Sequence, residues 1–254
     1  MSEITNTTSP LTVDARAISF LDRLRARVVF GKYDDYVDAR NAGVTHAEAV
    51  EAHRTGISLW DYTDARTSGA THAEVLEAYG NGIDVEPYAV ARREFGASHE
   101  EALLGHASGF DVINYAHALE VGASHAEVLE IEANGIHVGA YALARESRRA
   151  PSHTEVLEVH AKGIDVGEYA WLLSIASHEE VLDAYAKGVD LEIYRNARRY
   201  DDEWGSLSHE EALEVCLKGL DWPEYASLRG DYGRSHNEAI ASLVSADRGD
   251  LEED

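Results

Sequence analysis

Apolar residues recur along most of this 254-residue chain in short bursts separated by glycines and small polar residues. In residues 71–96 one burst holds Val75 and Ala78 and a second holds Val85 and Tyr88, at the three-residue spacing of one helix face. The same pair of bursts returns from about residue 33 to about residue 246. The pattern predicts a series of short amphipathic helices, here called helix A and helix B of each repeat.

The sequence Ser/Thr-His-x-Glu precedes each helix A and predicts a capping box. In a capping box the hydroxyl accepts the backbone N–H three residues on, and the glutamate accepts the N–H of the cap residue. Successive boxes are separated by 26, 27, 26, 28, 25, 31 and 27 residues. The boxes begin at Thr45, Thr71, Ser98, Ser124, Ser152, Ser177, Ser208 and Ser235.

Glycines and aspartates predict the other helix boundaries. Helix A stops at a glycine such as Gly82, and the apolar residue after it is typical of a left-handed C-terminal cap. An aspartate such as Asp84 then caps helix B, which carries Tyr-x-x-Ala-Arg or a variant and stops at a second glycine such as Gly96. Each repeat is therefore expected to be a helical hairpin that buries its apolar face only against its neighbours.

The repeat divides the chain into three parts. Residues 1–32 are expected to form a polar lead-in and an N-terminal capping helix from Val13 to Phe30, with Asp14 as its cap. Residues 33–234 form the hairpin array. Residues 235–254 are expected to form a C-terminal capping helix, from Ser235 to about Ser245, and an acidic tail.

In architecture the chain resembles the α-solenoid class, the helical-hairpin arrays to which TPR, Sel1-like and HEAT repeats belong. The resemblance covers about 210 residues and is general, because a period near 26 is shorter than the ~34 of TPR or ~33 of ankyrin, and neither signature is present. It implies an all-α, right-handed α-solenoid of about seven and a half helix-turn-helix repeats.

Charge narrows the class of partner. The chain has 22 Lys and Arg against 47 Asp and Glu, a formal net charge of -25. Such a surface repels nucleic acid and anionic membranes, so we expect a protein or peptide partner, basic in charge. Adaptation to a salty cytoplasm would explain the acidity equally well. No apolar run has the length of a membrane span, and the start of the chain has no signal-peptide pattern, so we expect a soluble, cytoplasmic protein.

Cysteine and histidine offer little metal chemistry. A single cysteine, Cys216, excludes an intramolecular disulfide and a cysteine metal cluster, and its helical position predicts a packed thiol. The box histidines form a row with neighbours roughly 8–10 Å apart, from which four ligands cannot converge on zinc, so neither metal nor cofactor is expected. We expect each histidine to fill the groove beside the preceding helix B, with the C-terminal carbonyls of that helix as candidate partners. A pH switch is a weaker alternative.

Two charged rows accompany the histidines. An acidic row lies three residues beyond each box glutamate and is either a surface for a basic partner or a solvated face. The arginines of helix B complement the helix dipole and are expected to pair with box or aspartate carboxylates of the next repeat. The acidic row consists of Glu51, Glu77, Glu130, Glu158, Asp183 and Glu214.

Two junctions break the period, and insertions in solenoids often carry binding. The first runs from Arg145 to Pro151 and the second from Arg198 to Leu207. The residues predicted to contact a partner there are Arg148, Arg149, Tyr200 and Trp204. Trp60, Trp171 and Trp222 are further candidates elsewhere in the array, although Trp171 and Trp222 could equally be core residues.

No catalytic motif stands outside the repeat. The sequence therefore favours a non-enzymatic scaffold that binds a protein or peptide along an acidic solenoid surface. The alternative is an acidic nucleic-acid mimic that inhibits a DNA-binding protein. Spread over a rod on the order of 60–75 Å, a charge of -25 gives roughly one charge per 2.5–3 Å, against about one per 1.7 Å in duplex DNA.

Overall fold

The structure is a computed structural model that describes residues 33–199 and 207–249. These ranges contain 16 α-helices and no strand, which confirms an all-helical repeat architecture. The predicted N-terminal helix and most of the acidic tail lie outside the described residues. No helix in the described ranges is long and apolar enough to cross a bilayer.

The odd-numbered helices are the A helices, and each begins at the histidine of a capping box. The last of them ends at Gly249, beyond the expected end near Ser245. They are α3 (His46–Thr55), α5 (His72–Gly80), α7 (His99–Ala107), α9 (His125–Ala133), α11 (His153–Ala161), α13 (His178–Ala186), α15 (His209–Leu217) and α17 (His236–Gly249).

The even-numbered helices are the B helices, and each carries one tyrosine of the repeat. They are α2 (Tyr33–Asn41), α4 (Leu59–Thr67), α6 (Val85–Glu94), α8 (Val112–Glu120), α10 (Val138–Glu146), α12 (Val166–Leu172), α14 (Leu191–Arg198) and α16 (Trp222–Gly230).

The predicted helix ends are present in detail. In all eight boxes the cap N–H donates to the glutamate at 2.6–2.9 Å, and the glutamate N–H donates to the cap hydroxyl at 3.2–3.4 Å. At the other end of α3, Gly56 has φ +96°, and the N–H of Ile57 donates to the carbonyl of Ala52 at 3.0 Å. A side chain there would be strained, so glycine terminates the helix.

The caps of helix B agree with the prediction in part. Asp111 accepts the N–H of Asn114 at 2.9 Å, and Asp165, Asp190 and Asp221 cap their helices in the same way. Asp84 also occupies the cap position, but its side chain accepts no capping hydrogen bond. At α6 the sequence therefore predicts the cap residue correctly, but the side-chain hydrogen bond expected from it is absent.

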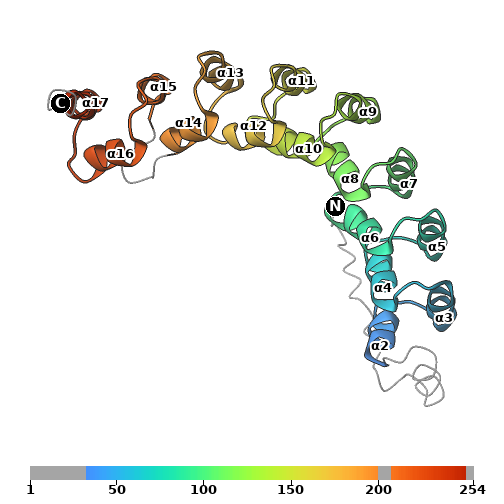
Figure 1. Cartoon of the computed structure of the whole chain (residues 1–254). Coiled ribbons are helices and arrows are strands. Elements are labelled where there is room, and N and C mark those ends of the chain that lie inside the picture. Colours follow the sequence, from blue (N-terminus) through green and yellow to red (C-terminus); the bar gives the residue numbers. More distant parts are fainter. Residues whose placement is uncertain (1–32, 200–206, 250–254) are drawn as a thin grey trace, which may run out of the picture. The chain divides into compact units, whose positions relative to one another are not determined.

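The chain divides into two compact units, Met1–Val128 and Leu129–Asp254. In the first unit α4 packs against α6 and α6 against α8, and in the second α10 packs against α12. Within each unit the B helices form one layer and the A helices lie on one side of it (Figure 1). Close packing of the B helices follows from their small side chains, because Ala65, Ala89 and Ala142 are completely buried.

The largest fully buried side chains of the core are tyrosines, one from each helix B. Each of these side chains is at most 1% exposed, although each carries a hydroxyl that must find a partner in the interior. The partner of that hydroxyl leads to the polar contacts between hairpins. The buried tyrosines are Tyr36, Tyr62, Tyr88, Tyr115, Tyr141, Tyr169, Tyr194 and Tyr225.

Candidate partner-binding site

Each box histidine contacts the buried tyrosine of the preceding helix B. The tyrosine hydroxyl lies 2.7–3.1 Å from the histidine Nδ1 in all eight repeats. The two rings meet edge to face, as at Tyr62 and His72, whose centroids are 5.8 Å apart. The prediction placed the histidine beside the correct helix but named the wrong candidate partner, since the contact is to the tyrosine hydroxyl and not to a C-terminal carbonyl.

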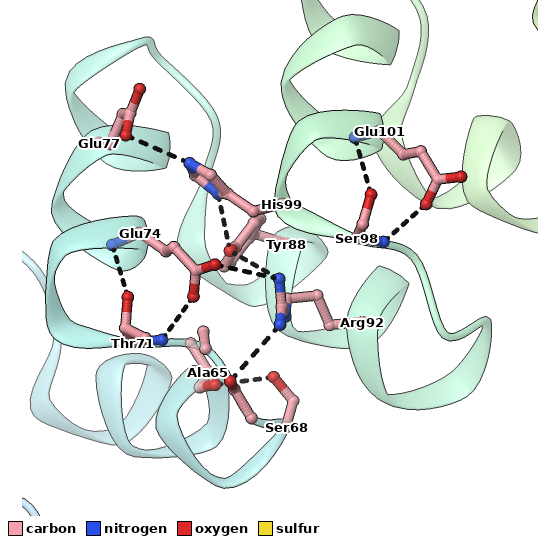
Figure 2. Close-up of polar contacts among 12 residues, drawn as sticks. Ala65, Ser68, Thr71, Glu74, Glu77, Tyr88, Arg92, Ser98, His99 and Glu101 are labelled. Atoms are coloured by element: carbon pink, nitrogen blue, oxygen red, sulfur yellow. Dashed lines mark hydrogen bonds and ion pairs between the residues drawn. The ribbon is translucent and has the colours of Figure 1, made fainter.

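The acidic row meets the other ring nitrogen. Glu51 Oε2 lies 3.2 Å from His72 Nε2, and equivalent pairs in five other repeats span 2.9–3.5 Å. Figure 2 shows His99 between Tyr88 and Glu77. The Nε2 atom of His99 lies 3.3 Å from Glu77 Oε2, and this ion-pair contact lacks the geometry of a hydrogen bond. Every member of the acidic row therefore has a histidine partner.

These contacts define the protonation of the ring. Burial raises the pKa of the Tyr62 hydroxyl to about 12, so this hydroxyl keeps its proton at neutral pH. The carboxylate of Glu51 can only accept a hydrogen bond, so in the neutral ring of His72 these contacts favour the tautomer with the proton on Nε2 and with Nδ1 accepting from Tyr62. With both nitrogens in use, the ring is a bridge between hairpins rather than a free base or metal ligand.

The histidine contacts vary in one informative place. Leu104 occupies the position of the acidic row in α7, so His125 has its tyrosine contact and no carboxylate partner in the described ranges. Among the described residues, no group of three or more His, Cys, Asp or Glu side chains is arranged to hold a metal ion.

Lysines neutralise part of the acidic row in the second unit. The Nζ atoms of Lys162, Lys187 and Lys218 lie 3.7, 2.5 and 2.9 Å from row carboxylates. The hydrogen bond from Lys187, with a second from His209, lowers the pKa of Asp183. These carboxylates are 41–49% exposed, but their charge already faces a lysine and a histidine.

Three arginines of helix B, Arg66, Arg92 and Arg198, lie within 4.0 Å of a carboxylate of their own hairpin. Arg66 lies 3.6 Å from Glu48, and Arg198 lies 3.4 Å from Glu180, each the box glutamate of the same repeat. Arg66 also donates to the carbonyl of Ala70, just before the next box, at 2.6 Å. The predicted pairing with the next repeat is therefore wrong at these positions, because the arginine points toward its own helix A.

A groove opens between α10 and α12 in the second unit, at the first irregular junction. Its volume is about 290 Å³, and its walls are mainly apolar. Leu143 and Trp171 are 52% and 66% exposed, so two large apolar side chains face solvent at one place. The lining residues are Leu143, Glu146, Ser147, Arg148, Ala170, Trp171 and Ser174.

The structure brings together only some of the residues predicted from sequence. Arg148 and Trp171 line the groove, and Arg149 is exposed at the same junction without lining it. Trp60 is exposed in the first unit, whereas Trp222 is half-buried and stacks on Tyr225. Tyr200 and Trp204 lie outside the described residues.

Sequence reasoning missed Leu143, the second apolar wall of the groove. Leu143 and Trp171 both stand six residues after the cap of their helix B, at His137 and Asp165. Alignment of the repeats by their caps would have paired the two positions. Their exposure could not be read in this way, because it depends on how α10 packs against α12.

Cys216 has no reactive setting. Its side chain is half-buried in α15, and burial raises the pKa of the thiol to about 11. The thiolate, which is the reactive form, is therefore scarce at neutral pH. This agrees with the prediction of a packed thiol.

Comparisons of the chain with protein-family models, with curated proteins and with solved structures found no match.

Proposed function

We propose that the protein is a non-enzymatic repeat scaffold, a right-handed α-solenoid with a period near 26 residues, that binds a protein or peptide partner. The observation that carries this proposal is the groove between α10 and α12, which is lined by two exposed large apolar side chains, Leu143 and Trp171. Adjacent large apolar side chains on a surface are typical of interaction sites.

The side chains of the repeat support the same proposal by elimination. The box glutamates accept from backbone N–H groups, and the box histidines contact tyrosines and, in six repeats, carboxylates. Groups committed in this way are poor candidates for acid–base catalysis, because each would first have to break a structural contact. The chemistry left to the described surface is recognition.

The net charge of -25 adds long-range selectivity. It repels polyanions and attracts a partner whose overall charge is positive, which raises the rate of encounter. Nucleic-acid mimicry would need an uninterrupted stripe of carboxylates. In the second unit Lys162, Lys187 and Lys218 interrupt the acidic row, so we favour the scaffold over the mimic.

A capture experiment with two tryptophan variants tests the proposal. Wild-type protein, Trp171→Ala and Trp60→Ala are used as bait in lysate of the source organism at low and high salt, with quantitative mass spectrometry. We expect a partner that Trp60→Ala retains and Trp171→Ala loses, because the two side chains are equally exposed and only Trp171 lines the groove. Retention at high salt indicates apolar contact, since salt screens exposed charges. Absence of any reproducible partner would contradict the proposal.

A further inference from the structure

The groove between α10 and α12 combines three features that point to the chemistry of its occupant. The first is the pair of apolar walls, Leu143 on α10 and Trp171 on α12. The cavity of about 290 Å³ is open to solvent and is of a size to admit a large side chain from another chain. An aliphatic or aromatic side chain would remove both walls from water.

The second feature is an unpaired cation on the rim. Carboxylates outnumber Lys and Arg by 47 to 22 in this chain, and Arg66, Arg93 and Arg198 each pair with one. Arg148 is exposed and pairs with no carboxylate in the described part of the chain. Glu146 also lines the groove, but it has an interaction of its own in the chain, whereas Arg148 is left to provide charge complementarity to an incoming acid.

The third feature is an unsatisfied hydroxyl. The Oγ atom of Ser147 is buried and has no hydrogen-bond partner in the described structure, although Ser147 lines the groove. A buried hydroxyl without a partner is costly, and the Oγ atom would have to turn toward the groove before the backbone of a bound peptide could supply one.

The backbone of the junction agrees with a binding role. Ala150 has φ +36° and is the one residue other than glycine with positive φ in the described ranges. Left-handed backbone is strained for alanine, and such strain concentrates at functional sites. Ala150 lies two residues after Arg148 and directly before the buried Pro151.

We propose that the groove binds a peptide segment of a partner protein that inserts one large apolar side chain between Leu143 and Trp171 and places a neighbouring aspartate or glutamate side chain on Arg148. This inference rests on the proposed function and specifies the segment that the scaffold recognises. The partner as a whole can still be basic, because net charge steers the encounter whereas Arg148 contacts one carboxylate.

A random 12-residue peptide library displayed on phage, selected on the full chain, tests the inference. We expect the enriched peptides to share a large apolar residue next to Asp or Glu. A synthetic peptide of that sequence should lose about tenfold or more in affinity for Trp171→Ala and for Arg148→Glu, measured by fluorescence anisotropy. Trp60→Ala should bind like wild type. Changing the acid of the peptide to lysine should restore affinity for Arg148→Glu.

The outcomes separate this inference from the proposed function. Enriched peptides that carry Lys or Arg beside the apolar residue, or that are insensitive to Arg148→Glu, would overturn the proposed chemistry. Peptides that bind Trp171→Ala as well as wild type would place binding outside the groove and leave the scaffold proposal standing. Failure to enrich any peptide would count against both. Circular dichroism checks that each variant is folded.

Discussion

The box histidine is the residue that most clearly links local sequence to packing between hairpins. Its backbone lies at the first position of helix A, where the capping box places it, and its ring reaches the buried tyrosine of the helix before. Six of the eight rings also meet a carboxylate. One short motif therefore caps its own helix and attaches it to the preceding hairpin.

Replacing one buried tyrosine hydroxyl tests that attachment. Tyr62→Phe keeps the ring but leaves Nδ1 of His72 without its donor. We expect a loss of about 1–2 kcal/mol in the free energy of unfolding, measured with urea, because a partly buried polar group is left unsatisfied. Tyr232→Phe is the matched control, since Tyr232 is 70% exposed, and it should change stability by less than about 0.5 kcal/mol. Equal effects of the two substitutions would argue against the tyrosine–histidine contact.

The box glutamates predict a dependence of stability on pH. The hydrogen bond from the backbone N–H of Thr71 lowers the pKa of Glu74 below its ordinary value of 4.5. A carboxylate with a lower pKa in the folded state stabilises the fold fully above its unfolded value, and this contribution is lost as pH falls through the folded value.

Glu74→Gln should therefore be least stable relative to wild type near neutral pH, and the difference should shrink below about pH 4.5. Urea unfolding at several pH values measures it. Glu86→Gln, in the same repeat, is the control, because Glu86 makes no hydrogen bond or ion pair in the described structure, and its cost should be small throughout. A difference for Glu74→Gln that is unchanged in acid would contradict the capping role of the charge.

At the scale of the helix, boundaries were predictable and contacts between hairpins were not. The boxes and the left-handed glycines act over three or four residues, so their spacing alone predicts the ends of α3 and α5. The partner of His72 depends on the angle at which two hairpins pack. The carbonyl of Ala70, just ahead of the box, already accepts a hydrogen bond from Arg66, and the imidazole ring of His72 contacts the hydroxyl of Tyr62 instead.

One repeat shows how packing overrides helix propensity. In α7, Gly105 occupies a position where α5 has Ala78. A Cβ at Gly105 would lie 2.5 Å from the ring of Tyr115, which stacks on Phe110. Other repeats have an aliphatic residue in place of Phe110. The larger aromatic ring is therefore accommodated by a missing methyl group on the facing helix.

Two glycine substitutions in helices should consequently have opposite signs. Gly105→Ala should destabilise by about 1–3 kcal/mol through overpacking against Tyr115. Gly80→Ala, where no atom lies within 4 Å of the new Cβ, should stabilise by up to about 1 kcal/mol through helix propensity. Thermal unfolding of both variants measures this. If Gly105→Ala also stabilised the protein, the close packing of Tyr115 on α8 against Gly105 on α7 would be wrong.

The candidate site was predictable only in part. The broken period makes Arg148 a candidate from sequence, and aromatic character makes Trp171 a candidate for either the surface or the core. That they line one groove with Leu143 follows from the packing of α10 on α12, which no local signal determines. The carboxylates of the acidic row were recognised as a set from the sequence, but their contacts were not. Each carboxylate meets a histidine of the next repeat, about 20 residues further along the chain.

At the scale of the whole molecule, the repeated residues make contacts between hairpins, and we propose that recognition takes place at an irregular junction. The tyrosine–histidine contact is present in every repeat, in both units, whereas the groove occurs where the period breaks. In helical repeat arrays the residues of the caps and the seam recur, whereas the residues at exposed positions vary. The central claim is therefore that the histidine rings are committed to contacts between hairpins.

The long-range ¹H–¹⁵N spectrum of the histidine rings, recorded at about pH 8 where ordinary histidines are neutral, tests this claim most directly. For the six histidines with a carboxylate partner, we predict a single tautomer, with the proton on Nε2 and an unprotonated Nδ1 that accepts a hydrogen bond. Signals averaged between the two tautomers, as for rings free in solvent, would contradict the account.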